Sequence, residues 1–468
     1  MSNDTKALKS GVWYTVANFI MKGIGFLTTP IFTRILSKAD VGYYSDYTSV
    51  LSVFTILMTL GIGTTFIRAK FDYKDEFDDY ISSSLVLSSV VTLIWGTLIC
   101  LFSSLFSSIT KVEPKYLYIM VVYLFMYSAV DIYQAKERHL FGYKRSVFIS
   151  LLVAVSTALL SVLLVNYLDN KLDGRVLGSA IPTVAVGAIL YISIISKGKH
   201  IKVSYWKYAL PICIPYIPHI LSMTLLNSMD KIMITNICGA EDNALYSVAY
   251  TCGAIITMLA TSINTAFAPW LGEKLNEKKH DEIYNVSIKY VGLFAIATCG
   301  VMLITPEILL IMGGKNYSEA IYVMPPVALG CVCQFVYSMY VSVEQFNKKT
   351  TGMAIASAVA ALSNYVLNSI YIPKYGYIAA AYTTLASYLI LLVIHVLLVH
   401  RMGMGNVYPL KKISIILLVL LVYMILVNLL YQVMVVRYIL VVAYAAACLW
   451  FVNKNKKNII ALFKRGKE

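Results

Sequence analysis

The chain has 468 residues, of which 59% are hydrophobic and only 13% are charged, and its formal net charge is +15. An ordinary soluble domain carries about 25% charged residues, so this composition excludes that class. A positive excess could indicate nucleic-acid binding, but in a membrane protein it more often reflects basic cytoplasmic loops. The loop charges below favour that second interpretation.

Long apolar runs predict membrane-spanning helices throughout the chain. Each run is continuously apolar, which favours helices of about 20 residues over a barrel of alternating strands. Residues 1–10 are polar and a full-length span follows without a cleavage site, so we expect no signal peptide. The sequence therefore predicts an all-α polytopic membrane protein. We expect fourteen spans at residues 11–33, 43–66, 80–106, 115–135, 146–167, 176–196, 209–237, 244–270, 286–312, 318–340, 351–372, 376–399, 413–430 and 434–452.

Loop charge sets the expected orientation. With a cytoplasmic N-terminus, the cytoplasmic segments hold 27 Lys and Arg, the opposite loops hold nine and the spans hold three, which accounts for all 39. This bias predicts that both termini are cytoplasmic. Because no loop leaves room for a catalytic domain, we predict a transporter and not an enzyme.

Two stretches of the chain recur at an offset of 202 residues and predict two similar halves. The alternative is chance similarity among apolar residues, but polar Asp, Asn and Gly positions also match. Six spans per half is an even number, so the halves are expected to be parallel repeats. The expected units are residues 1–200 (spans 1–6), 201–405 (spans 7–12) and 406–468 (spans 13–14 and a basic tail). The matched positions are Thr33, Ile35, Asp40, Tyr44, Ser45, Thr55 and Leu57 with Thr235, Ile237, Asp242, Tyr246, Ser247, Thr257 and Leu259, and Ala154, Ala158, Leu160, Ser161, Asn166 and Gly174 with Ala356, Ala360, Leu362, Ser363, Asn368 and Gly376.

Ionisable side chains in the first span suggest a binding site, because such groups are costly in lipid. Lys22 lies about 17 Å into the span at 1.5 Å per residue, close to the middle of the bilayer. We interpret Lys22 as a cation that meets an anionic substrate; the alternative is a lysine paired with an acid for folding. Arg34 ends the same span near the outer face.

Span seven combines charge with helix-disrupting residues. It contains Asp230 and Lys231, and His219 lies next to three prolines between residues 211 and 218. The prolines remove backbone donors and predict a kink or a break, or simply a static bend. Broken helices near a repeat interface are where transporter sites usually lie.

The remaining polar candidates fall into three groups. Near the end of span four, Asp131, Glu137 and Arg138 could form a cytoplasmic gate or a plain salt bridge, and Glu344 is a further gate candidate. Asn364 and Asn368 could line the second half, although hydrogen bonding between helices explains such residues equally well. Tyr14 and Tyr216 lie in or near polar spans, and an aromatic face with a hydroxyl suits a sugar ring.

The sequence contains no motif for a metal or an organic cofactor. It lacks a phosphate-binding Gly-rich loop, so we do not expect an ATP-driven pump. Cys331 and Cys333 have the wrong spacing for a zinc or redox pair, and most other cysteines lie in apolar runs. A proton or sodium gradient is the expected source of energy, and no residue pattern decides between them.

Several stretches in combination resemble the polysaccharide-transporter branch of the multidrug/oligosaccharidyl-lipid/polysaccharide (MOP) superfamily, the Wzx-type repeat-unit flippases. They are residues 209–219 (ALPICIPYIPH), 226–235 (LNSMDKIMIT), 244–250 (ALYSVAY), 364–368 (NYVLN) and 373–384 (PKYGYIAAAYTT). The resemblance implies two six-helix bundles plus two helices in a bacterial inner membrane. It also implies transport of lipid-diphosphate-linked oligosaccharides for O-antigen, capsule or exopolysaccharide.

Within that resemblance, a basic lumen is expected at Lys22 and Arg34, and the Asp230–Lys231 pair matches the family pattern. The expected partners are a polyprenyl-diphosphate-linked oligosaccharide and membrane lipids, with a polysaccharide polymerase and glycosyltransferases as candidates; no nucleic acid is expected.

Two other functions stay open from sequence. A drug/cation antiporter would need deep carboxylates in the first half, where span two holds only Asp46 and spans one, three, five and six hold none. A membrane-embedded glycan polymerase would need an exposed catalytic loop, and the outer loops are short.

Overall fold

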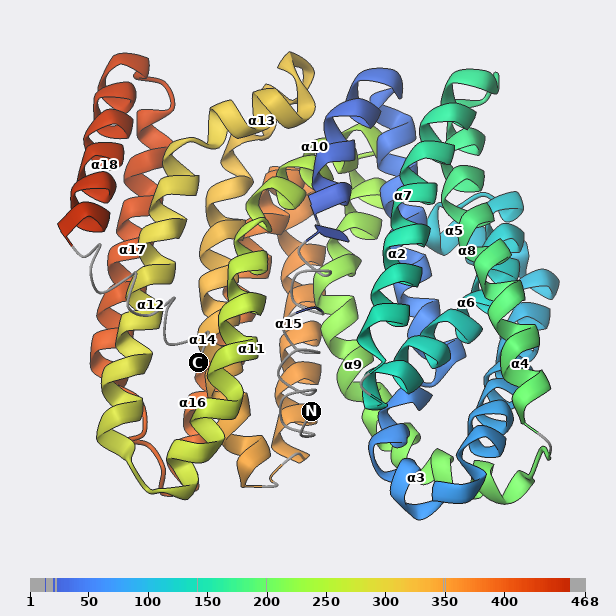
Figure 1. Ribbon diagram of the computed structural model, residues 1–468. Helices are drawn as coiled ribbons and strands as arrows, with labels where there is room; N and C mark the ends of the chain where they lie inside the picture. The colour runs from blue at the N-terminus through green and yellow to red at the C-terminus, as the bar shows by residue number, and fades with distance from the viewer. Residues whose placement is uncertain are drawn as a thin grey trace.

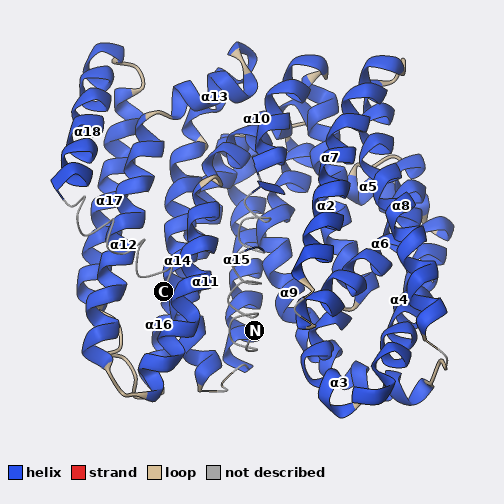
Figure 2. Ribbon diagram, in the orientation of Figure 1, coloured by secondary structure: helices blue, strands red, loops and turns tan. Residues whose placement is uncertain are grey.

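The computed structural model describes residues 13, 20–21, 23–140, 142–198, 200–347, 349 and 351–454. Within these residues the chain forms helices joined by short turns and contains no strand (Figure 2). The all-α class predicted from sequence is therefore confirmed.

The first half runs through nine elements after a helical stretch at residues 23–35. Helix α9 then crosses to the second half (Figure 1). In order, the elements are α2 (Lys38–Thr59), η1 (Ile62–Thr65), α3 (Phe66–Asp72), η2 (Lys74–Glu76), α4 (Phe77–Leu101), α5 (Ser103–Thr110), α6 (Pro114–His139), α7 (Tyr143–Tyr167), α8 (Lys171–Lys197) and α9 (Val203–Ile237).

The second half and the C-terminal helices complete the bundle. They are α10 (Ala240–Gly253), α11 (Ile256–Asn276), α12 (His280–Leu303), α13 (Thr305–Gly313), η3 (Lys315–Tyr322), α14 (Met324–Phe346), α15 (Thr351–Tyr375), α16 (Tyr377–Arg401), α17 (Leu410–Leu430) and α18 (Met434–Lys454). The expected boundaries of the three units stay predictions.

The chain is a multi-pass membrane protein. In the described part of the chain, ten helices are long and apolar enough to cross a bilayer, or eleven if the bent pair α2–α3 counts as one span. Many large apolar side chains on these helices are exposed, as lipid-facing residues are; Leu418 is 60% exposed and Leu163 is 64% exposed. The expected total of fourteen spans stays a prediction.

Several helix boundaries repeat at the spacing found in the sequence. Helix α2 begins at Lys38 and α10 begins at Ala240 (240 − 38 = 202). The break between α4 and α5 is at Phe102, and the break between α12 and α13 is at Ile304 (304 − 102 = 202). The internal repeat therefore extends from matched residues to matched interruptions of the helices.

The positions of the broken spans differ from the sequence-based expectation. Helix α9 contains Pro211, Pro215 and Pro218 and nevertheless continues without interruption from Val203 to Ile237. The second span is broken instead, because Leu60 and Gly61 adopt left-handed backbone conformations (φ 55° and 57°) and α2 meets η1–α3 at 46°. A leucine in that conformation carries no sequence signal for a break.

Helix α9 belongs to the packing of both halves. Its first part packs in a buried cluster with residues of the first half through Tyr205 and Ala209, and its last part packs in a cluster of the second half through Leu226 and Ile234. Near its start, the Trp206 indole donates to a backbone carbonyl of α4 at 2.8 Å. This helix thus runs beside the space between the two halves, where the polar residues described next are found.

Candidate functional site

The two halves meet at a tight seam between α2 and α10. A Cβ atom on Gly42 would lie 1.9 Å from the carbonyl oxygen of Ala240, so only glycine permits this approach of the two backbones. The amide of Asn243 donates to the carbonyl of Gly42 at 3.1 Å and to Asp46 Oδ1 at 2.8 Å. The Oγ atoms of Ser45 and Ser247 lie 2.6 Å apart. The seam is at the end of the molecule that the loop charges predict to face outside.

A polar pocket of about 210 Å³ opens beside this seam, and we call it the cationic pocket. It is lined by residues of the 23–35 helix, α2, α8, α9 and α10, including the hydroxyls of Thr33, Ser45 and Thr251. Two cations, Arg175 and Lys231, also line it. Among the described residues, neither cation has a carboxylate oxygen within 4.0 Å. The pocket therefore presents two cations and many hydrogen-bonding groups, while the buried carboxylates of Asp230 and Asp46 act electrostatically on Lys231.

Arg175 is held in place by aromatic rings. Its guanidinium carbon lies 3.7 Å from the ring centre of Phe32 and 4.2 Å from that of Tyr44. Cation–π contacts of this kind orient a guanidinium and leave its in-plane N–H groups free to bind an anion. Arg175 thus has a fixed position, and its guanidinium N–H groups donate to no acceptor among the described residues.

Lys231 links the cationic pocket to a second cavity. Its Nζ lies 5.4 Å from the centre of the Tyr250 ring, and Tyr250 lines a cavity of about 670 Å³, which we call the amide-lined cavity. Asn227, Asn264 and Gln334 contribute amides to it, and the lining residues that the structure describes include no charged side chain. The two spaces therefore adjoin across one tyrosine and differ in charge.

A buried cluster of oxygen-bearing side chains surrounds Asp230. Its Oδ2 accepts hydrogen bonds from the hydroxyl of Tyr246 and from Thr384 Oγ1, the latter at 3.3 Å. Asn364 Nδ2 donates to Thr384 Oγ1 at 3.1 Å, and Asn368 Nδ2 donates to Asn364 Oδ1 at 3.1 Å. Three predicted site residues, Asp230, Asn364 and Asn368, are thus brought into one cluster that joins α9, α10, α15 and α16.

The other predicted substrate residues lie elsewhere. Arg34 is exposed, and its guanidinium donates to the backbone carbonyls of Pro30 at 2.6 Å and Ile311 at 3.0 Å, which ties the first helix to α13. His219 Nδ1 lies 2.9 Å from Ser357 Oγ, and Tyr216 is 43% exposed beside it. Arg34, His219 and Tyr216 line neither the cationic pocket nor the amide-lined cavity. Lys22 and Tyr14 lie outside the described residues.

The predicted gate residues do not form one site. Glu137 is buried and its carboxylate packs against the backbone of Gly142. A neighbouring residue, Lys136, forms an ion pair with Asp78. None of the ion pairs among the described residues includes Asp131 or Arg138. Glu344 Oε1 lies 2.7 Å from His395 Nδ1, a contact between α14 and α16 inside the second half.

The prediction from sequence missed Arg175 because the predicted sixth span begins at residue 176. Helix α8 already begins at Lys171, since the side chain of Asn170 caps it by accepting from the backbone N–H groups of Leu172 and Asp173. Gly174 serves close helix packing: a Cβ there would lie 2.6 Å from the backbone of Leu164. The Asn170 cap was the signal that could have placed Arg175 inside the span.

Comparison with known proteins identifies the family of this chain. The family model for polysaccharide biosynthesis proteins matches residues 7–275. The chain belongs to the polysaccharide biosynthesis protein family. A second family model, MatE, matches residues 215–370, and both matches agree with a polysaccharide transporter of the MOP superfamily.

Curated relatives of this polysaccharide biosynthesis protein are distant. It is 24% identical over 286 residues to "Lsg locus putative protein 1" of Haemophilus influenzae. The alignment covers 58% of this chain and 68% of the relative. It is 21% identical over 446 residues to an uncharacterized membrane protein of Methanocaldococcus jannaschii, which covers 86% and 85% of the two chains.

Solved structures show that this family member has the MOP transporter fold. The lipid II flippase MurJ in an inward closed conformation superposes with a TM-score of 0.72 at 16% identity, covering 95% of this chain and 99% of that chain. An inward-facing multidrug resistance MATE transporter superposes with a TM-score of 0.64 at 14% identity, covering 82% and 95%. The family resemblance found in the sequence is thereby confirmed.

Proposed function

We propose that this protein moves a polyprenyl-diphosphate-linked oligosaccharide across the bacterial inner membrane by alternating access. The observation that carries the proposal is the position of Arg175 and Lys231 in one pocket on the seam between the halves. Among the described residues, Arg175 has no carboxylate oxygen within 4.0 Å, whereas Asp230 and Asp46 act electrostatically on Lys231. A cation inside a membrane protein that has no carboxylate partner, as holds for Arg175 among the described residues, is costly and is typical of a site for an anionic substrate.

The cationic pocket suits a diphosphate. The planar guanidinium of Arg175 matches two phosphate oxygens at once, and the Lys231 ammonium adds a second positive charge. The hydroxyls of Thr33 and Thr251 already donate to the carbonyls of Met312 at 2.7 Å and Ser247 at 2.8 Å, so they would have to rotate away from these partners to donate to the remaining oxygens. The apolar polyprenyl tail of the substrate would stay in the bilayer.

The amide-lined cavity suits the sugars. The amide groups of Asn227, Asn264 and Gln334 can donate and accept hydrogen bonds with sugar hydroxyls, and Tyr250 and Tyr337 offer aromatic faces. The cavity adjoins the cationic pocket at Tyr250. A diphosphate in the cationic pocket would then lie beside the first sugars in the amide-lined cavity.

The closed seam gives the conformational state that we propose for this structure. Contacts between α2 and α10 close the end that is expected to face outside. With both termini cytoplasmic, this state would correspond to a transporter closed to the outside. Translocation would then require the Gly42–Ala240 contact to open.

For energy coupling we propose the cluster around Asp230. It offers one buried carboxylate together with hydroxyl and amide oxygens from Tyr246, Thr384, Asn364 and Asn368. Hard cations such as sodium prefer oxygen ligands, and a buried carboxylate can also carry a proton. Ion or proton binding at Asp230 would be linked to the adjoining Lys231 and hence to the cationic pocket.

Two alternatives are less well supported by the geometry. A drug/cation antiporter, suggested by the MatE match, would need a carboxylate exposed to a cationic substrate, whereas Asp46 is fully buried and hydrogen-bonded to Asn243. A glycan polymerase would need catalytic groups in an accessible site, and its test is polymerising activity of the purified chain.

A leaflet-accessibility assay tests the proposal. The purified chain is reconstituted into proteoliposomes with a fluorescent lipid-linked oligosaccharide, and movement to the opposite leaflet is measured by access of an external quencher. We expect gradient-dependent movement that is lost in the Arg175→Gln variant. Efflux of cationic dyes with no movement of the lipid-linked oligosaccharide would instead support the antiporter.

A further inference from the structure

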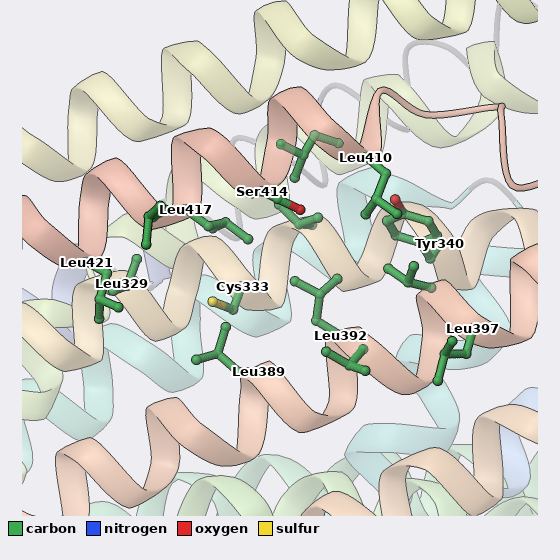
Figure 3. Close-up of a pocket in the computed structure, with 15 residues that line it drawn as sticks. Leu329, Cys333, Tyr340, Leu389, Leu392, Leu397, Leu410, Ser414, Leu417 and Leu421 are labelled. Atoms are coloured by element: carbon green, nitrogen blue, oxygen red, sulfur yellow. The ribbon is translucent and has the colours of Figure 1, made fainter.

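An apolar groove runs between α14, α16 and α17, apart from the two spaces on the seam (Figure 3). Its volume is about 430 Å³, and its lining is aliphatic except for Cys333, Tyr340 and Ser414. None of its lining residues also lines the cationic pocket or the amide-lined cavity. The groove is therefore an apolar surface separate from both of these spaces.

The groove has the length of one lipid leaflet. Tyr340, Leu397 and Leu410 lie together at one end, and Leu329 and Leu421 lie at the other (Figure 3). The twelve residues from Leu410 to Leu421 span about 17 Å of helix, or about half of a 30 Å hydrocarbon core. The Leu410 end is the one that the loop charges predict to be cytoplasmic.

Two cations stand at that end in register with the walls of the groove. Arg401 follows Leu397 by four residues on α16, and Lys411 precedes Ser414 by three residues on α17, so each shares a helix face with groove-lining residues. Both cations are exposed, and the ion pairs of the described residues include neither. The mouth of the apolar groove is thus positively charged.

An unpaired hydroxyl lies at the same end. Tyr340 is 2% exposed, and its hydroxyl is buried without a hydrogen-bond partner among the described residues. A buried hydroxyl without a partner is costly, so an acceptor supplied by a ligand would stabilise the site. The groove therefore combines an apolar trough, one polar donor and two cations in the order in which a phospholipid presents its chain, ester and phosphate.

We propose that the groove binds an acyl chain of an anionic phospholipid from the cytoplasmic leaflet. The chain would lie along Leu329–Leu421, an ester oxygen would accept from Tyr340, and the phosphate would lie between Arg401 and Lys411. The occupant is a lipid of the surrounding bilayer and not the transported molecule, because the groove shares no residue with the spaces on the seam.

Lipid-dependent stability of the purified full-length chain tests this site. The thermal unfolding midpoint is measured in detergent with increasing phosphatidylglycerol or, separately, phosphatidylcholine. We compare wild type with Arg401→Gln/Lys411→Gln, with Tyr340→Phe, and with Lys144→Gln/Lys197→Gln, a control that removes two exposed charges from the same predicted face. Phosphatidylglycerol is expected to stabilise the wild type and the control at lower concentration than phosphatidylcholine.

The variants separate a built site from general attraction to anionic lipid. At about 1 kcal/mol per basic residue, the Arg401→Gln/Lys411→Gln variant should need about thirtyfold more phosphatidylglycerol for the same shift. Tyr340→Phe should need about fivefold more. Equal losses in the two double variants, or no preference for phosphatidylglycerol, would overturn the proposal. Competition by undecaprenyl diphosphate without any effect of phosphatidylglycerol would show that the substrate tail occupies the groove instead.

Discussion

Ser45 and Ser247, which are 202 residues apart in the chain, share a hydrogen bond of 2.6 Å between their side-chain oxygens. They are also counterparts in the internal repeat, because 202 is the offset at which the two halves match. A residue can touch its own repeat counterpart only near the axis that relates the halves. The axis of the repeat therefore passes through the seam between α2 and α10, next to the cationic pocket.

The seam can be tested by cross-linking. We expect Ser45→Cys/Ser247→Cys to form a disulfide under oxidising conditions, because side-chain oxygens 2.6 Å apart lie on converging Cβ atoms. The cross-link should stop movement of the lipid-linked oligosaccharide, and a reductant should restore it. Full transport with the disulfide present, as judged by mobility on a non-reducing gel, would show that this seam does not open. Each single variant serves as a control.

The close contact at Gly42 gives a second prediction. Gly42→Ala places a Cβ atom 1.9 Å from the carbonyl oxygen of Ala240, so the closed seam should lose about 1–3 kcal/mol of stability. Stability is measured as the thermal unfolding midpoint. Opening of the seam is measured by placing a cysteine in the cationic pocket and labelling it with a reagent added from outside, and the rate of labelling should increase. Gly272→Ala is the matched control, since a Cβ there meets nothing within 4 Å. Equal behaviour of the two variants would contradict the steric argument.

Arg175 provides the most direct test of the proposed substrate. Arg175→Gln keeps hydrogen-bonding capacity but removes the charge held over Phe32 and Tyr44, and a charged hydrogen bond contributes about 1.5–3 kcal/mol. We expect the apparent affinity for the lipid-linked oligosaccharide to fall about tenfold to a hundredfold in the leaflet assay. Arg68→Gln, an exposed arginine paired with Asp72, should leave it unchanged. If both variants behave like the wild type, Arg175 does not bind the substrate.

Asp230 allows energy coupling to be separated from substrate binding. Asp230→Asn can preserve the hydrogen bonds from Tyr246 and Thr384 while it removes the negative charge. Transport driven by an imposed proton or sodium gradient should fall to the level measured without a gradient, whereas binding of the lipid-linked oligosaccharide should persist. A variant that still responds to both gradients would exclude Asp230 as the coupling residue.

Lys22 carries a prediction from sequence alone, since it lies outside the described residues. Lys22→Ala should abolish export of the glycan while the protein level stays unchanged, because a mid-bilayer cation is expected to contact the anionic substrate. Export is measured by surface glycan and protein level by immunoblot. Normal export by this variant would remove Lys22 from the mechanism.

Apolar runs were enough to predict the all-α membrane fold. Gly239 and Gly314 lie between predicted spans and Gly376 lies at the start of one, with positive φ angles of 104°, 78° and 69°. The break after α2 was not predicted, because Leu60 adopts a left-handed conformation that is uncommon for residues other than glycine; Gly61, which shares this conformation, was the available signal. The prolines of α9 do not break the helix, which runs from Val203 to Ile237, while the predicted kink or bend stays a prediction.

The candidate site was only partly accessible from sequence. Asp230 and Lys231 were identified because charges inside a span are rare. Arg175 was missed because helix α8 begins at Lys171, before the predicted start of the span. The role of Asn227 and Gln334 in the amide-lined cavity depends on how α9 and α14 face each other, which one sequence does not reveal.

The hydroxyl-to-hydroxyl contact of Ser45 and Ser247 also bears on how easily the outer end can open. Water can replace each partner with a hydrogen bond of similar strength, so parting the two serines has a small net free-energy cost, about 0.5–1.5 kcal/mol. Neither residue carries a charge, and added salt should leave the balance between shut and open forms at this contact nearly unaltered. Binding and release of the proposed charged substrate, and not ionic strength, would then determine how often this end opens.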